Sequence, residues 1–107
     1  MSDFTEYLKE VFQALGVVTV RKMFGGYGIY LDGLMFALVA DDELYLKVDK
    51  ITLNQFEEKK LSPFVYTKKG KPIKMSYYQA PEEIYEDPDV ASVWGKLAFE
   101  AALRGKK

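Results

Sequence analysis

Lysines and tyrosines gather in the part of the sequence best suited to bind another molecule. Four lysines lie between residues 68 and 74, and tyrosines flank them at positions 66, 77 and 78. Proteins that bind single-stranded nucleic acid combine cationic and aromatic side chains in this way. A lysine-rich hairpin tip also keeps an edge strand from aggregating, and a cationic surface attracts an acidic protein or ligand. We favour edge protection here, and the other two interpretations stay open.

A second unusual string, Gly25-Gly26-Tyr27-Gly28, has the glycine density of a phosphate-binding loop. Such a loop requires Gly-Lys-Ser or Gly-Lys-Thr followed by a helix, whereas a β-rich segment follows here. Glycines also allow a strand to bend, to bulge or to admit a close backbone neighbour. We therefore interpret Gly25, Gly26 and Gly28 as residues that shape a sheet.

The residue types that carry most enzyme and metal chemistry are missing from this sequence. The chain has no His and no Cys, which removes the commonest general base, the commonest transition-metal ligand and all thiol chemistry. Asp41, Asp42 and Glu43 are consecutive in a turn, so their carboxylates do not converge on one cation. We expect no catalytic residue, no metal site and no cofactor.

The hydrophobic pattern predicts an α+β domain with a mainly antiparallel sheet of about six strands and helices packed on it. The expected element order is α-β-β-β-β-α-β-β-α, in two layers. Helices are expected over residues 4–15, 49–60 and from 88 onward, and strands over residues 17–23, 27–31, 34–40, 44–48, 64–67 and 73–78. The chain of 107 residues fits one domain, at 1–104, with a short tail at 105–107.

Three local signals support this order of elements. Asp32-Gly33 between apolar runs predicts a tight hairpin turn, because a type I′ turn needs positive φ at both central positions. Asp87-Pro88 predicts the start of the last helix, with an apolar stripe that includes Val90, Val93 and Trp94. Residues 34–40 are apolar at every position, which indicates a central strand covered on both faces or a homodimer interface.

Charge and hydropathy indicate where the protein works. The formal net charge is −1, which argues against nucleic-acid binding by bulk electrostatics. The first residues lack the pattern of a signal peptide, and no apolar run approaches the roughly 20 residues that cross a bilayer. We expect a cytoplasmic protein without a membrane partner.

Several strings carry a family resemblance. They are residues 21–30 (RKMFGGYGIY), Asp32-Gly33, residues 35–42 (MFALVADD), residues 44–49 (LYLKVD), Pro63-Phe64, residues 69–71 (KGK), residues 75–78 (MSYY) and residues 81–83 (PEE). In this order they resemble the N-terminal domain of the TfoX/Sxy family, over nearly the whole chain. The full-length regulators of that family carry a second, C-terminal helical domain. This chain corresponds to the N-terminal one, either as a single-domain relative or as part of a longer regulator.

The resemblance implies a function that the residues alone do not reveal. Members of this family are bacterial regulators of natural competence, that is, of DNA transformation. They are thought to act as co-activators with the cyclic AMP receptor protein and not as free-standing readers of DNA sequence. The resemblance also implies a two-layer fold similar to that of type III secretion chaperones. The expected partner is therefore a transcription factor such as the cyclic AMP receptor protein, or RNA polymerase.

Our leading hypothesis is a non-enzymatic protein-interaction module in transcriptional regulation. The candidate partner-binding residues are Arg21, Lys22, Phe24, Tyr27, Tyr30, Lys68, Lys69, Lys71, Lys74, Tyr77 and Tyr78, with Gly25, Gly26, Gly28, Asp32 and Gly33 as structural residues. One alternative is direct nucleic-acid binding through Arg21, Lys22 and the lysine-rich hairpin. Another is a chaperone-like or small-ligand-binding domain, with an apolar groove beside the glycine-rich bend.

Overall fold

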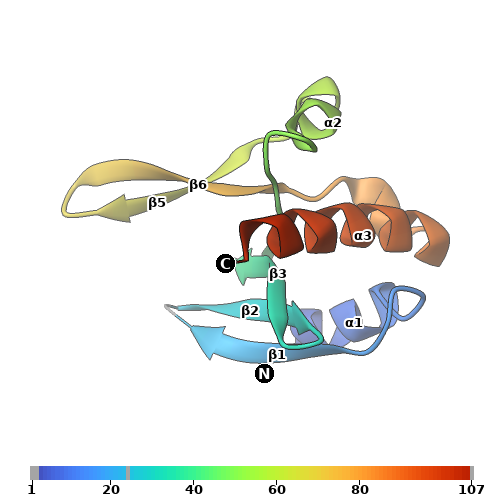
Figure 1. The fold of residues 1–107 in the computed structure, drawn as a ribbon. Coiled ribbons are helices and arrows are strands. Elements are labelled where there is room, and N and C mark those ends of the chain that lie inside the picture. The colour runs from blue at the N-terminus through green and yellow to red at the C-terminus, as the bar shows by residue number, and fades with distance from the viewer. Residues whose placement is uncertain (1–2, 24, 107) are drawn as a thin grey trace.

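The structure, a computed structural model, describes residues 3–23 and 25–106. Its elements follow the predicted order, with a short 3₁₀ helix added before the last helix (Figure 1). They are α1 (Asp3–Val11), β1 (Val18–Met23), β2 (Gly26–Leu31), β3 (Leu34–Ala40), β4 (Glu43–Lys47), α2 (Leu53–Glu58), β5 (Pro63–Lys68), β6 (Lys71–Gln79), η1 (Glu82–Tyr85) and α3 (Pro88–Gly105). The predicted α+β fold class is confirmed.

One six-stranded sheet organises the molecule, in the order β1-β2-β3-β4-β6-β5. The strand pairs of the described residues are antiparallel, as tight hairpin connections require. The turn between β2 and β3 has the predicted conformation, since φ is 51° at Asp32 and 77° at Gly33. The β4–β6 pairing joins segments far apart in sequence, with Leu46 opposite Tyr78.

The hydrophobic core lies between one face of the sheet and the helices. Ile29, Ala37 and Leu46 lie in register on adjacent strands and are fully buried. Across the layer, the Phe12 ring of the turn after α1 packs edge-on against Phe36 of β3, with centroids 5.5 Å apart. The single Trp, Trp94 on α3, packs edge-on against Phe56 of α2 at 5.0 Å. α3 thus closes the core over β3 and β4.

The last helix begins as predicted but its apolar stripe differs from the prediction. The Asp87 carboxylate accepts a hydrogen bond from the Asp89 backbone N–H at 2.8 Å, and Pro88 opens the helix. Val93, expected in the buried stripe, is 60% exposed. Trp94, also expected in the stripe, and Ala98 do face the core, and Val93 lies about one hundred degrees around the helix from Trp94, toward solvent.

The second helix is shorter than predicted. α2 covers only Leu53–Glu58, inside the expected range of 49–60. The Asp49 carboxylate accepts hydrogen bonds from the backbone N–H groups of Ile51 and Thr52 at 3.1 and 3.2 Å, as a helix-capping residue does. The Leu53 N–H also donates to the Asp49 carbonyl oxygen at 2.9 Å, so residues 50–52 form a turn that leads into α2.

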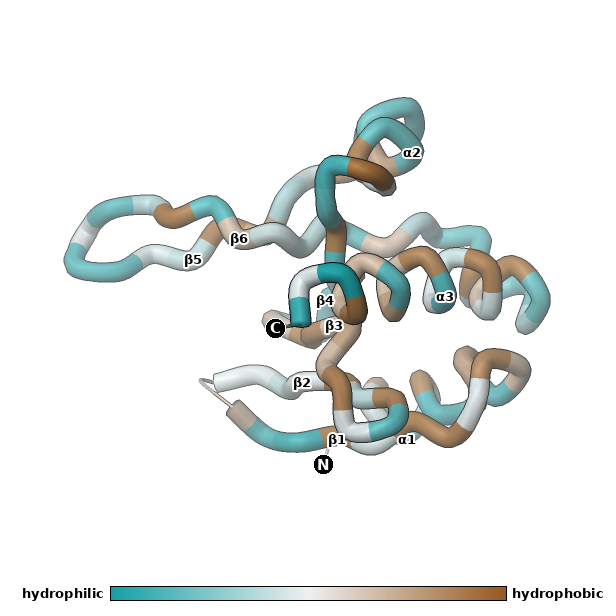
Figure 2. The backbone as a smooth tube through the Cα atoms, in the orientation of Figure 1, coloured by the Kyte–Doolittle hydropathy of each residue, from teal (hydrophilic) through white to brown (hydrophobic). Residues whose placement is uncertain are grey.

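The β5–β6 hairpin projects from the body on the same side as the β1–β2 turn (Figure 1). Its tip is hydrophilic, as the hydropathy colouring in Figure 2 shows. Both hairpins therefore extend beyond the helical layer, which gives the molecule two prongs. In the described part of the chain, no helix is long and apolar enough to cross a membrane.

Candidate functional site

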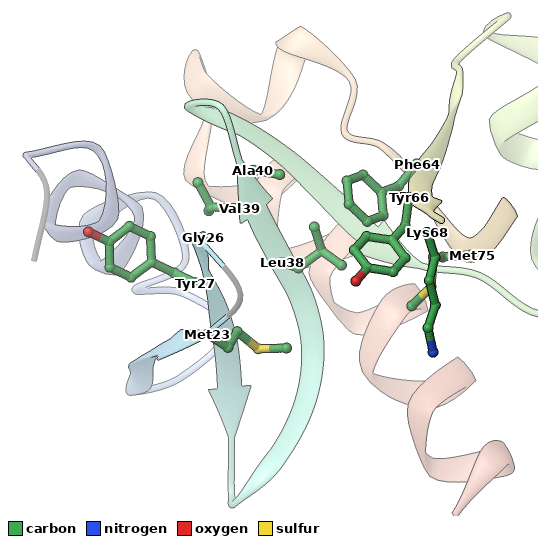
Figure 3. A pocket seen from close by; sticks show the side chains of 10 residues that line it. All are labelled: Met23, Gly26, Tyr27, Leu38, Val39, Ala40, Phe64, Tyr66, Lys68 and Met75. Carbon is green, nitrogen blue, oxygen red and sulfur yellow. The ribbon is translucent and has the colours of Figure 1, made fainter. Parts of the chain in front are cut away.

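An apolar cavity of about 350 Å³ opens between the two prongs (Figure 3). This volume lies at the lower end of the roughly 300–1,000 Å³ range of ligand pockets. The β1–β2 hairpin, β3 and the β5–β6 hairpin line it with Met23, Gly26, Tyr27, Leu38, Val39, Ala40, Phe64, Tyr66, Lys68 and Met75. The cavity lies beside the glycine-rich bend, where the sequence analysis placed an apolar groove.

The cavity results from the curl of the sheet. β3 and β5 both line it, although β4 and β6 lie between them in the sheet. Phe64 on β5 packs against Tyr45 on β4, with ring centroids 5.0 Å apart. Because side chains alternate along a strand, Tyr66 and Lys68 share the face of Phe64. In Figure 3, Phe64 and Tyr66 form a wall opposite Leu38.

Two glycines of the predicted structural motif allow the cavity-side strands to pack closely. A Cβ at Gly26 would lie 2.2 Å from the carbonyl oxygen of Val39, so only glycine fits beside β3 there. A Cβ at Gly28 would lie 2.9 Å from the Met23 sulfur and 3.0 Å from the Tyr30 ring. Gly28 therefore leaves room for Met23 and Tyr30 above the open face of the sheet.

The candidate cations lie on the two prongs. On β1, the Arg21 guanidinium lies 5.5 Å from the centroid of the Tyr30 ring, a cation–π contact across the β1–β2 pair. On the other prong, the Lys74 ammonium lies 5.5 Å from the Tyr78 ring. Lys68, Lys69 and Lys71 are exposed around the tip. The three ion pairs of the described residues involve none of the cations on either prong.

The tyrosines of the lysine-rich constellation separate in the structure. Tyr78 is 5% exposed and packs against Phe56 in the core, so burial gives its ring a packing role. Tyr77 is 8% exposed and lies under the Lys47 ammonium, 5.1 Å from its ring centroid. Tyr66 is 40% exposed and lines the cavity. An exposed surface on which Tyr77 and Tyr78 both present their rings does not exist in this fold.

Two other candidate partner-binding residues, Tyr27 and Tyr30, have neighbours within the chain. Tyr27 lines the cavity, but its ring points away from it and packs against the core (Figure 3). Tyr30 lies close enough to Tyr77 to influence its ionisation. Burial raises the pKa of Tyr77, and the neighbouring Tyr30 adds to the increase, so this hydroxyl stays protonated at neutral pH. Phe24 lies outside the described residues.

A bidentate ion pair lies away from the cavity and connects α3 to the turn before α2. Arg104 donates from Nε to Asp49 Oδ2 at 2.6 Å and from Nη2 to Asp49 Oδ1 at 3.1 Å. These hydrogen bonds from Arg104 lower the pKa of Asp49 to about 2. The geometry anchors the C-terminal end of α3, which is a structural role.

Within the described ranges, no three acidic side chains come together to hold a metal ion. Asp41, Asp42 and Glu43 occupy an exposed turn, with φ of 52° and 58° at the two aspartates. The cavity itself contributes one ionisable amine, Lys68, and one phenol, that of Tyr66. Its lining is therefore suited to binding apolar groups next to a positive charge.

Comparison with protein families shows which family the chain belongs to. A sequence profile of the TfoX N-terminal domain matches residues 10–102, a range that includes the six strands and the residues lining the cavity. The chain belongs to the TfoX N-terminal domain family. The cavity therefore lies wholly within the matched TfoX N-terminal domain, while α3 continues past the match to Gly105.

Two curated relatives match this chain over most of its length. Protein Sxy of Escherichia coli (strain K12) is 28% identical over 98 residues, which cover 92% of this chain and 47% of Sxy. DNA transformation protein TfoX1 of Aliivibrio fischeri (strain ATCC 700601 / ES114) is 31% identical over 88 residues, which cover 82% of this chain and 42% of TfoX1. The chain thus spans about half the length of the curated relatives it matches.

The sequence analysis missed several residues of the TfoX-domain cavity. Met23, Leu38, Phe64 and Met75 line it, and none was a candidate partner-binding residue. A signal existed in the period of two along the second prong: Phe64, Tyr66 and Lys68 alternate on β5, and Ile73, Met75 and Tyr77 alternate on β6. This pattern predicts an apolar face that ends at Lys68 near the tip of the hairpin. It does not reveal that β3 faces it.

Proposed function

We propose that this domain is a non-enzymatic, cytoplasmic interaction module through which a bacterial transcription regulator of DNA transformation contacts a protein partner. Membership of the TfoX N-terminal domain family carries the proposal, together with the name of one relative, a DNA transformation protein. The cavity between the prongs is the proposed contact surface. It combines exposed apolar groups with cations, as the hot spots of protein interfaces do.

We propose a transcription protein as the partner, as the family resemblance implies. The cyclic AMP receptor protein and RNA polymerase are the two candidates. Deleting the gene in its host should reduce both transformation frequency and transcription of DNA-uptake genes, and expression of the intact gene should restore them. Unchanged transformation in the deletion strain would contradict the proposed role.

A second test uses purified proteins. The domain should co-elute with, or bind calorimetrically to, the cyclic AMP receptor protein or RNA polymerase. Met75→Glu, which places a carboxylate in the apolar wall, should weaken this binding. Lys96→Glu provides a matched surface control, because Lys96 is exposed on α3 outside the cavity lining. β3 is a central strand whose middle residues are buried within the chain, so its apolar sequence does not require a homodimer. Light scattering on the same samples determines the oligomeric state.

Direct nucleic-acid binding is the second candidate function, and the exposed lysine tip with Tyr66 beside it favours it. It predicts affinity for single-stranded DNA that falls steeply with salt concentration. Lys69→Glu combined with Lys71→Glu should then abolish binding. Binding that survives this double charge reversal would exclude the lysine tip as a nucleic-acid site.

A further inference from the structure

The charges of this chain are segregated in a way that its net charge hides. Residues 16–31 and 61–80 contain no Asp or Glu. They contain six of the fifteen Lys and Arg residues: Arg21, Lys22, Lys68, Lys69, Lys71 and Lys74. The rest of the chain then has nine cationic residues against sixteen acidic ones, a formal charge of −7. Two purely cationic segments thus stand out from an acidic body.

The fold brings these two segments to one place. Residues 16–31 form the β1–β2 prong and residues 61–80 form the β5–β6 prong, and both prongs line the same cavity. The described ion pairs lie elsewhere, so no carboxylate neutralises these cations within the described residues. An apolar cavity flanked by unpaired cations is complementary to a ligand with an apolar group and adjoining negative charges.

The charges around the cavity differ between its two ends. Ala40 lines one part of it, and the acidic turn Asp41–Glu43 follows directly. Lys68 lines the wall of the other prong, close to the tip lysines. Like charges repel, so an anionic ligand is oriented with its carboxylates toward Lys68 and away from Asp41.

We propose that the cavity binds an acidic peptide segment of the partner, which inserts one large apolar side chain between Met23, Leu38 and Met75 and directs its carboxylates to Lys68 and Lys71. This inference rests on the proposed function as a protein-interaction module. It adds the chemistry of the partner segment and its orientation in the site.

The lining favours a peptide over single-stranded nucleic acid. Methionines at positions 23 and 75 form flexible walls that adapt to irregular apolar side chains. Nucleic acids without sequence preference stack their bases on exposed aromatic faces, whereas Tyr77 and Tyr78 are buried.

Methionine methyl groups provide a direct reporter of binding, because the chain has only four methionines. The chain labelled with ¹³C at these methyl groups is titrated with a synthetic peptide that has a central phenylalanine flanked by glutamates. The Met23 and Met75 signals should shift. The same peptide with alanine in place of phenylalanine should bind about tenfold more weakly, as should a version with lysines in place of glutamates.

Variants of the chain test the apolar wall and the cationic end of the site separately. Met75→Glu should remove the preference for phenylalanine over alanine. Lys68→Glu combined with Lys71→Glu should weaken the glutamate peptide by about tenfold or more, with Lys96→Glu as the control that leaves binding unchanged. The circular-dichroism spectrum and the thermal unfolding temperature of each variant establish that it is folded.

The outcomes separate this inference from the proposed function. If the purified transcription partner binds but Met75→Glu and the Lys68–Lys71 reversal leave its affinity unchanged, the cavity inference is wrong and the interaction module stands. If single-stranded DNA shifts the methyl signals and the peptide does not, the ligand of the cavity is a nucleic acid and the peptide inference is wrong. The absence of methyl shifts with the glutamate–phenylalanine peptide would overturn the inference as well.

Discussion

The ring of Tyr45 on the inner strand β4 lies 5.0 Å from the ring of Phe64 on the edge strand β5, with the two planes tilted by 57°. β6 lies between these strands in the sheet, so the contact crosses over it. This relationship holds the β5–β6 prong against the open face of the sheet. The cavity wall formed by Phe64, Tyr66 and Lys68 therefore depends on it.

Phe64→Ala should loosen this prong without unfolding the core. Aromatic pairs contribute about 0.5–1.5 kcal/mol beyond their buried area, so the opening of β5 should become easier by about that amount or slightly more. Amide hydrogen exchange in Pro63–Lys68 should accelerate several-fold while β3 stays protected. Val65→Ala is the matched control, because Val65 is 49% exposed on the opposite face. Equal exchange rates in both variants would refute the anchoring role of Tyr45–Phe64.

Gly26→Ala should destabilise the whole domain by about 1–3 kcal/mol or more, a loss typical of steric strain in a packed region. The new Cβ would meet the Val39 backbone, which cannot move aside as a flexible side chain could. Urea unfolding followed by Trp94 fluorescence measures the change.

Gly105→Ala is the control for that substitution. A Cβ at position 105 has no neighbour within 4 Å, and the residue belongs to α3. Replacing a helical glycine by alanine should leave stability unchanged or raise it by up to about 1 kcal/mol. A Gly26→Ala variant as stable as the wild type would show that β2 does not need glycine beside β3.

The Asp49–Arg104 pair should make stability depend on pH in the acid range. The pKa of Asp49 falls from 3.8 to about 2 in the folded state, so the unfolded chain takes up its proton first. The contribution is therefore complete above the ordinary pKa and disappears as the pH falls toward about 2. Because Arg104 is partly exposed, we expect about 1 kcal/mol or less at neutral pH.

Arg104→Gln tests this dependence. The variant should be less stable than the wild type at neutral pH, and the two unfolding free energies should converge as the pH falls from 3.8 to about 2. Lys96→Gln on the same helix should give a curve parallel to that of the wild type. A constant difference between Arg104→Gln and the wild type across this range would contradict the assignment.

Reversing charges at the lysine tip should leave the fold stable, although the same change should weaken ligand binding. Lys68, Lys69 and Lys71 crowd like charges around one turn without a carboxylate partner in the described residues. Lys68→Glu combined with Lys71→Glu should therefore preserve stability or raise it by a few tenths of a kcal/mol. Thermal unfolding at low salt measures this effect. A large loss of stability would mean that these lysines serve the fold and not a ligand.

Local signals predicted most of the fold because they depend on neighbouring residues. The Asp32-Gly33 turn, the Asp87 cap and strand β3 all lie where the sequence placed them. Two features depend on residues far apart in the chain. These are the pairing of β4 with β6 and the curvature of the sheet, which brings β5 to face β3. No local period reports such relationships, so the cavity lining at Met23, Leu38 and Met75 was not predicted.

The burial of Tyr77 and Tyr78 also could not be predicted from local sequence. Tyr77 and Tyr78 alternate along β6, and which of them faces the core depends on the partner strand and the helix above it. Sequence proximity grouped both with the lysines, whereas Tyr78 packs against Phe56. The exposed Val93 was misassigned because several faces of α3 are apolar in sequence.

The most direct test of the cavity as the contact surface is site-specific photocrosslinking with the purified, labelled chain added to an extract of its native host. The chain has no cysteine, so a single introduced cysteine takes up a benzophenone reagent selectively. With the label at Met75→Cys, we predict crosslinks to the cyclic AMP receptor protein or to RNA polymerase. With the label at Val93→Cys, exposed on α3, we predict none. Equal crosslinking from both positions, or crosslinking only from position 93, would contradict the cavity as the contact surface.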